Sequence, residues 1–124
     1  MKIRIKENSV RFRLTRSEVE QVCTKGSYTE HTEFDTAHFT YGVNVKEDIS
    51  DLMADFMGNA IILYLPKHFI EEWQQTDRVG FERQIPLKNG KTLLVLLEKD
   101  FVCMDDNRED QSDNYPNPTA EKLR

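Results

Sequence analysis

The sequence predicts an α+β fold that is mainly antiparallel β, with about eight strands, two short helices and a barrel-like closure. Three observations support this fold class. Apolar residues alternate with polar residues in short runs, which is the period of half-buried strands. Turn signals separate the runs, and the strongest of them, Asn89-Gly90, favours a two-residue hairpin. Two short helical patterns interrupt the runs, so that the elements follow the order ββαββ twice.

The first ββαββ unit begins with a hairpin that has one apolar and one basic face. Ile3 and Ile5 alternate with cations in the first run, as do Val10, Phe12 and Leu14 in the second. Thr15 and Glu18 then form a capping-box signature, which predicts a helix start. Gly26 supplies the stop signal of this helix. A second hairpin is predicted over residues 28–35 and 38–46.

The second unit carries the clearer signals. Pro66 suits the first position of a helix, where a missing amide hydrogen costs nothing. The run from Leu93 to Leu97 is apolar at every position, so we expect this strand to be covered on both faces. The predicted elements are strands over 52–57, 59–65, 79–87 and 91–98 and a helix over 66–75.

A shift of 51 residues superimposes the apolar pattern of one half on the other without a gap. It places Val10, Phe12 and Leu14 on Ile61, Leu63 and Leu65, and Val43 on Leu94. This match predicts a single domain over 1–106 that contains a pseudo-repeat, 2–47 and 51–98. Two closures stay open, an eight-stranded barrel or two interleaved halves in a pseudo-dimeric barrel. Residues 107–124 are acidic and contain prolines, which predicts a mobile tail.

Two resemblances rest on short motifs. Gly58, the apolar strand to Leu65, Pro66-Lys67, Asp77-Arg-Val79 and Asn89-Gly-Lys91 resemble the ββαββ unit of the AbrB/MazE swapped-hairpin regulators. That resemblance implies two interleaved units that present basic residues to DNA. The opening Lys-Ile-Arg-Ile-Lys strand and the Ser112-Asp-Asn-Tyr-Pro-Asn-Pro118 segment also resemble a group of small uncharacterised bacterial proteins, which implies no activity.

Composition narrows the cellular setting and the partners. No apolar run reaches the roughly 18 residues of a membrane span, and residues 1–6 lack the apolar core of a signal peptide. Two cysteines, Cys23 and Cys103, are too few for a secreted disulfide scaffold. We therefore expect a cytoplasmic protein without a membrane partner, either a monomer or a weak homodimer. The net charge of −5 disfavours contact of the whole surface with nucleic acid.

No catalytic or metal-binding constellation is found in the sequence. The chain has no Gly-x-Ser-x-Gly elbow and no glycine-rich phosphate loop. His31, His38 and Glu33 share one predicted hairpin, but zinc requires three or four ligands at defined spacing, so we expect no metal. The acidic run Asp105-x-Asn107-x-Glu109 lacks the glycine and the final glutamate of a calcium loop. We predict a non-enzymatic protein with neither metal nor cofactor.

The leading functional hypothesis is a binding protein for a small hydrophobic molecule. Eight strands leave an interior that side chains or a ligand must fill. The candidate lining residues are Phe12, Phe34, Phe39, Tyr41, Phe56, Phe81 and Trp73.

The first alternative is a nucleic-acid-binding regulator of the swapped-hairpin type, which would use the basic N-terminal hairpin to contact phosphates. Its candidate residues are Lys2, Arg4, Lys6, Arg11, Arg13 and Arg16. Nucleic acid is not favoured, because the rest of the chain is acidic and the basic face can be a solvated surface. A second alternative is a protein-interaction module that uses the acidic tail.

Overall fold

The computed structural model describes residues 1–101 and 112–116, which form eight strands and two short helices. The predicted tail over 107–124 lies largely outside the described residues. The elements, in chain order, are β1 (Lys2–Lys6), β2 (Ser9–Leu14), α1 (Arg16–Lys25), β3 (Ser27–Glu33), β4 (His38–Lys46), β5 (Met53–Met57), β6 (Ala60–Pro66), the 3-10 turn η1 (Lys67–Phe69), α2 (Ile70–Gln75), β7 (Gly80–Pro86) and β8 (Thr92–Lys99).

Local chemistry explains the bounds of α1. The Glu18 carboxylate accepts a hydrogen bond from the Thr15 amide at 2.8 Å, so the predicted capping box is present. Gly26 ends the helix in the left-handed region with a φ of 88°, and its amide donates to the Val22 carbonyl. The second helical segment has no such cap. It begins after Pro66 as a 3-10 turn and becomes α-helical at Ile70.

The strands form two separate mixed sheets, so the predicted antiparallel, barrel-like closure is wrong in both of its forms, the eight-stranded barrel and the pseudo-dimeric barrel. Sheet A has the order β1-β2-β8-β7 and sheet B the order β3-β4-β6-β5. In each sheet two antiparallel hairpins are joined by a central parallel pair, β2 with β8 and β4 with β6. Alternation and turn signals report hairpins only, whereas these parallel pairs join strands that are far apart in the sequence.

Side chains, rather than backbone ladders, bridge the edges at which a barrel would have closed. On one flank the Met1 ammonium forms an ion pair with Glu30 of β3 at 2.6 Å. On the other flank Arg83 of β7 donates to the Leu52 carbonyl, just before β5, at 2.7 Å. The sheet edges therefore stay open while the two sheets remain tied together.

Each sheet combines one hairpin from each half of the chain. The β1–β2 and β5–β6 hairpins have the same register, shifted by 51 residues, because Lys2 pairs with Arg13 and Met53 with Tyr64. Beyond the helices the shift grows. The first residues of β3 and β7 are 53 apart, because α2 ends 50 residues after α1 and is followed by four connecting residues instead of one. The shift between β4 and β8 is 54, so Val43 corresponds to Leu97 rather than to Leu94. A gapless repeat is therefore wrong, and a duplication stays a prediction.

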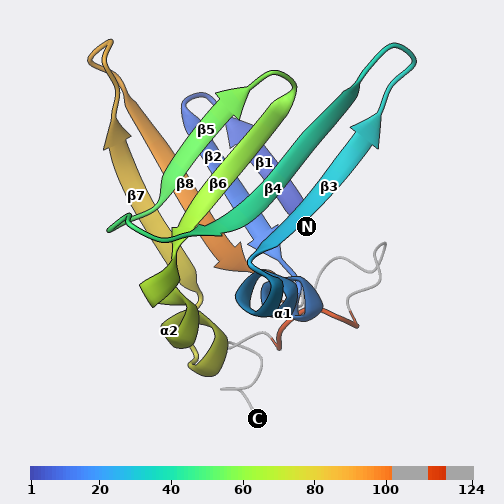
Figure 1. Cartoon of the computed structure of the whole chain (residues 1–124), viewed down its shortest axis with the longest axis vertical. Coiled ribbons are helices and arrows are strands. Elements are labelled where there is room, and N and C mark those ends of the chain that lie inside the picture. Colours follow the sequence, from blue (N-terminus) through green and yellow to red (C-terminus); the bar gives the residue numbers. More distant parts are fainter. Residues whose placement is uncertain (102–111, 117–124) are drawn as a thin grey trace.

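The core lies at the end of the sheets where both helices sit. Figure 1 shows α1 and α2 below the sheets and the four hairpin turns at the opposite end. The Trp73 indole is fully buried there, and its Nε1 donates to the Val79 carbonyl at 3.2 Å. The other buried apolar residues of this cluster are Phe12, Leu14, Val19, Val22, Val43, Leu52, Leu63, Leu65, Phe81, Val95 and Leu97. None of the described helices has the length and apolar character needed to cross a membrane.

The core position predicts how stability is distributed along sheet A. Leu97 is fully buried on the inner face near the helices, whereas Ile5, on the same face near the turns, is 56% exposed. We expect Leu97→Ala to lower the free energy of unfolding by about 2–5 kcal/mol. Ile5→Ala should lower it by less than about 1 kcal/mol, because most of that side chain is already in water. Urea unfolding followed by Trp73 fluorescence measures both, and equal losses would show that the sheets are closed at both ends.

Candidate functional site

An apolar trough lies between the two sheets at the turn end. The inner face of sheet A is the one that carries buried Phe12 and Leu97, and that of sheet B carries buried Val43 and Leu63. Side chains alternate along a strand, so the register places further apolar residues on these faces nearer the turns. The apolar trough is lined by Ile5, Val10, Ile85 and Leu93 from sheet A and by Phe39, Tyr41, Phe56 and Ile61 from sheet B.

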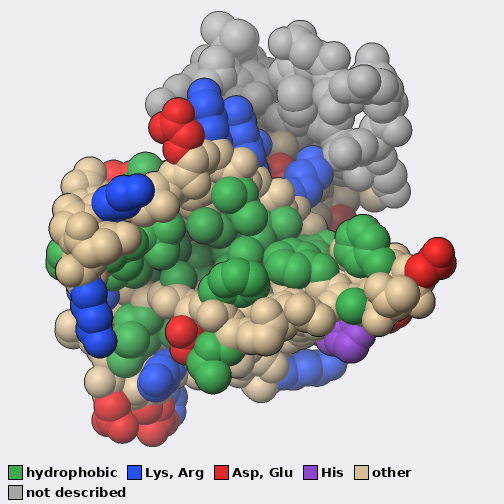
Figure 2. All heavy atoms as spheres, turned by 90° about the horizontal axis from the view of Figure 1, so that it is seen from above, with side chains coloured by type: hydrophobic (Ala, Val, Ile, Leu, Met, Phe, Trp, Pro, Cys, Tyr) green, Lys and Arg blue, Asp and Glu red, His purple; other side chains and the backbone are tan. Residues whose placement is uncertain are grey.

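Exposure rises along the inner faces from the helices to the turns. Leu63 is fully buried, but Phe56, which pairs with Ile61 one step nearer the turns on the same face, is 70% exposed. Phe39 and Tyr41 stack with ring centroids 5.9 Å apart and are only half-buried. Figure 2, which views the turn end, shows the hydrophobic side chains as a continuous band between the two sheets. The trough is therefore an open apolar surface continuous with the core.

The polar groups on the flanks of the trough already have partners. The Met1 ammonium donates to Glu18 at 2.5 Å and pairs with Glu30 at 2.6 Å. Burial alone would lower the pKa of this amine, but the hydrogen bonds and charges of the two carboxylates outweigh burial and raise it. Burial and the same two carboxylates raise the pKa of Tyr28, so its hydroxyl stays protonated. A ligand in the trough would therefore be recognised by apolar contact rather than by hydrogen bonds from these groups.

The seven aromatic residues predicted to line a cavity fall into three groups. Phe12, Trp73 and Phe81 are buried core residues at the helix end, and Trp73 and Phe81 are in edge-to-face contact. Phe34 lies in the β3–β4 turn and is 65% exposed. Only Phe39, Tyr41 and Phe56 line the apolar trough. The prediction did not include the aliphatic residues of the apolar trough. Their alternation along the strands is the same as that of residues in a closed core, as for Ile5, Val10, Ile85 and Leu93.

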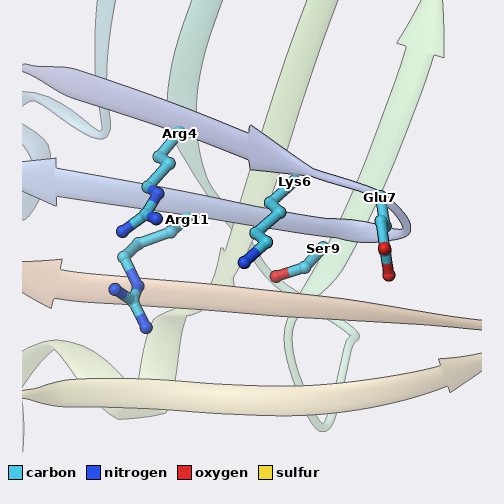
Figure 3. Close-up of a pocket in the computed structure, with 5 residues that line it drawn as sticks. All are labelled: Arg4, Lys6, Glu7, Ser9 and Arg11. Carbon is cyan, nitrogen blue, oxygen red and sulfur yellow. The ribbon is translucent and has the colours of Figure 1, made fainter.

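The outer face of sheet A gathers five of the six predicted basic residues. Lys2, Arg4 and Lys6 of β1 and Arg11 and Arg13 of β2 all point away from the core. Figure 3 shows Arg4, Lys6, Ser9 and Arg11 on one side of the hairpin, extending toward β8. They line a hollow of about 330 Å³ together with Glu7. We call the hollow lined by Arg4, Lys6, Glu7, Ser9 and Arg11 the basic hollow.

Carboxylates neutralise one end of this face more than the other. Glu98 Oε1 lies 3.2 Å from Arg11 Nε and 3.5 Å from Arg13 Nε, and Asp100 pairs with Lys2 at 3.3 Å. Within residues 1–101 and 112–116, no carboxylate forms an ion pair with Arg4 or Lys6. The uncompensated positive charge is therefore concentrated at the turn end, in the basic hollow.

Arg16 is not part of the basic face, which corrects the sixth basic residue of that prediction. It begins α1 and lines a groove of about 940 Å³ at the helix end, together with Val79, Lys99 and Tyr115. Two cations lie close to the Tyr115 ring, with the Arg16 guanidinium 5.3 Å and the Lys99 ammonium 5.1 Å from its centroid. Burial lowers the pKa of Lys99, although Asp77 opposes this effect. Lys99 Nζ donates to the Thr76 carbonyl at 2.9 Å, so this amine has a structural partner.

Further reactive side chains of the described residues include two histidines on neighbouring strands and one cysteine. His31 and His38 meet edge to face with centroids 5.5 Å apart, and His31 Nδ1 lies 2.8 Å from the Thr40 hydroxyl. No set of three metal-ligating side chains gathers anywhere in the described ranges 1–101 and 112–116. Cys23 is half-buried with a free thiol, while Cys103 and the acidic run at 105–109 lie outside the described residues.

Comparison with known proteins adds a family but no activity. A protein-family model described as a family of unknown function (DUF7009) matches residues 1–119. No curated protein and no solved structure matches the chain. The family match includes every strand, so both the apolar trough and the basic hollow lie inside the matched region.

The environment of Cys23 predicts an unreactive thiol. Burial raises its pKa from 9.0 to about 11, although the nearby Lys99 charge acts in the opposite direction. Two pKa units reduce the thiolate fraction about a hundredfold, so a Cys103→Ser variant should react with a disulfide reagent at pH 8 about a hundredfold more slowly when folded than in urea. Comparable rates in the two states would show that the thiol is activated, and would reopen the question of nucleophilic chemistry.

Proposed function

We propose, from the premise that the chain belongs to the family of unknown function DUF7009, that it is a non-enzymatic binding protein for an apolar ligand. The ligand occupies the apolar trough, between the two sheets and against the open side of the core. The observation that supports this proposal most directly is the exposure of Ile5 and Phe56 on the inner faces. Two sheets that packed against each other along their whole length would have buried both side chains.

The energetics of the trough favour an occupant. Exposed apolar patches of this kind in folded proteins mark ligand or partner sites, whereas isolated exposed hydrophobic residues are ordinary. Covering a phenylalanine side chain that is 70% exposed, as Phe56 is, contributes about 1–2 kcal/mol. Several half-buried residues of the trough, such as Phe39 and Ile85, add smaller contributions.

The shape and chemistry of the trough suggest an acyl chain. Each sheet has four strands, and three inter-strand spacings of about 4.8 Å make each wall of the trough about 14 Å wide. The residues that line it offer aliphatic and aromatic carbon, and the polar groups beside it, Glu30 and Arg83, are engaged with other partners. Such a surface selects by length and shape, so we take a fatty acid of medium chain length as the simplest occupant.

The resemblance to swapped-hairpin regulators is a weaker guide to function. Each sheet pairs a hairpin of one half with a hairpin of the other half, which is the kind of interleaving that this resemblance implies. This topology supports a likeness of architecture. The charges of the basic face do not favour the DNA-binding role, because Glu98 and Asp100 neutralise part of that face.

Two neighbouring residues of β5 provide a matched test. Phe56 and Met57 are 70% and 71% exposed, but they point to opposite faces of sheet B. We expect Phe56→Gln to weaken binding of dodecanoate about tenfold, since the substitution removes apolar contact from the trough. Met57→Gln should leave binding unchanged. Isothermal titration calorimetry measures both, and the thermal midpoint confirms that each variant is folded.

The proposal fails if wild-type protein binds neither dodecanoate nor an apolar fluorescent dye at micromolar protein. It also fails if Phe56→Gln and Met57→Gln weaken binding equally, because the ligand would then not distinguish the inner face from the outer face.

A further inference from the structure

The geometry points to a second binding site, a phosphate site in the basic hollow on the outer face of sheet A. We propose that it takes the phosphate group of a small phosphorylated molecule. The site does not depend on the apolar trough, which lies on the opposite face of the same sheet. The two proposals can therefore fail separately.

The strand register places like charges directly opposite each other in the hollow. Arg4 of β1 pairs with Arg11 of β2, and Lys6 pairs with Ser9. Like charges at directly opposed positions of a sheet destabilise it. The arrangement is relieved when an anion lies between the two guanidinium groups. Figure 3 shows all four side chains on the same side of the hairpin, as a shared anion requires.

The basic hollow contains cationic donors that an anion can bind. In the described part of the chain, Arg4 and Lys6 have no ion pair, and Glu98 is shared between Arg11 and Arg13. Arg11 Nε is buried and lies 3.2 Å from Glu98, yet it has no hydrogen-bond partner among the described residues. A buried donor without a partner is costly, and an incoming oxyanion would satisfy it. Two guanidinium groups, one ammonium and the Ser9 hydroxyl thus converge on the hollow.

A phosphate group fits this donor set better than a carboxylate does. Arginine presents several N–H donors in a planar fork that matches phosphate oxygens. A phosphate monoester carries nearly two negative charges at neutral pH, which balances the two cations without ion pairs. Leu94 lies on the same outer face of β8, beside Ser9, and its half-buried side chain offers an apolar surface to the carbon part of the ligand.

The surroundings favour a small ligand over nucleic acid. Glu7 lies at the rim of the hollow, and Glu82 and Glu98 share the outer face of sheet A. A duplex laid across this face would bring its phosphates close to these carboxylates. The net charge of −5 adds long-range repulsion for a polyanion. A volume of about 330 Å³ suits a single phosphorylated group.

The test is a titration with three probes, monitored by calorimetry at low ionic strength: inorganic phosphate, a hexose monophosphate and a short DNA duplex. We expect the hexose monophosphate to bind at least as tightly as inorganic phosphate, and the duplex to bind more weakly per phosphate. Arg4→Gln should weaken binding of the monophosphate by about tenfold or more, because a charge-assisted contact is lost. Lys88→Gln, which removes an exposed lysine from the β7–β8 turn, is the charge-matched control and should have little effect.

A gain-of-affinity variant keeps the test decisive even if Arg4→Gln unfolds. Glu98→Gln removes the carboxylate that competes for Arg11 and Arg13, so it should tighten binding of the monophosphate severalfold. The proposal is overturned if no phosphate probe binds, or if Lys88→Gln weakens binding as much as Arg4→Gln does. Binding of the duplex alone, lost at higher salt, would also overturn it, because it would identify the face as a nucleic-acid surface.

Discussion

A core at one end of two sheets is the constraint on which the rest of the structure depends. The described residues form two short helices, and both lie at the same end, where the side chains of Trp73 and Leu97 are buried. Within residues 1–101 and 112–116, no third layer covers the inner faces at the other end. Their alternation still places apolar residues there, so Phe56 and Ile5 remain in contact with water. The apolar trough follows directly from this uneven coverage.

The pairing of strands makes the open end stable enough to persist. Every strand is hydrogen-bonded to a neighbour, and the central parallel pairs join the two halves of the chain. Ties at both flanks, the Met1 ammonium with Glu30 and Arg83 with the Leu52 carbonyl, hold the sheets without closing a barrel. Long-range pairing of this kind costs loop-closure entropy, which the shared core must offset. A ligand in the trough would add contacts where the protein itself supplies few.

Sequence reasoning predicted the local elements well, because their causes are local. Alternation located the eight strands to within about two residues, and the capping signature located the start of α1. It did not predict that β2 lies parallel to β8, because no local pattern encodes which distant strand is the neighbour. The basic face was predicted from alternating cations, but Arg16 was wrongly included because the turn of the chain into α1 carries it to another surface. The apolar trough was missed as an open surface because exposure is a tertiary property.

The two proposed sites use opposite faces of sheet A and opposite kinds of chemistry. Apolar contact dominates on the inner face, and fixed positive charge dominates on the outer face at the turn end. Both arise from the strict alternation of β1 and β2, in which each second residue belongs to the other surface. A single β-hairpin therefore contributes to both of the proposed sites.

Residue-resolved NMR during a titration with dodecanoate tests the central claim most directly. The account predicts that the largest shift changes fall on inner-face residues at the turn end, such as Ile5, Phe39 and Ile85, with little change at Asp55 or Met57 on the outer face of β5. Changes centred on the outer faces, or on the groove at the helix end, would contradict the claim that the opening between the sheets is the binding site.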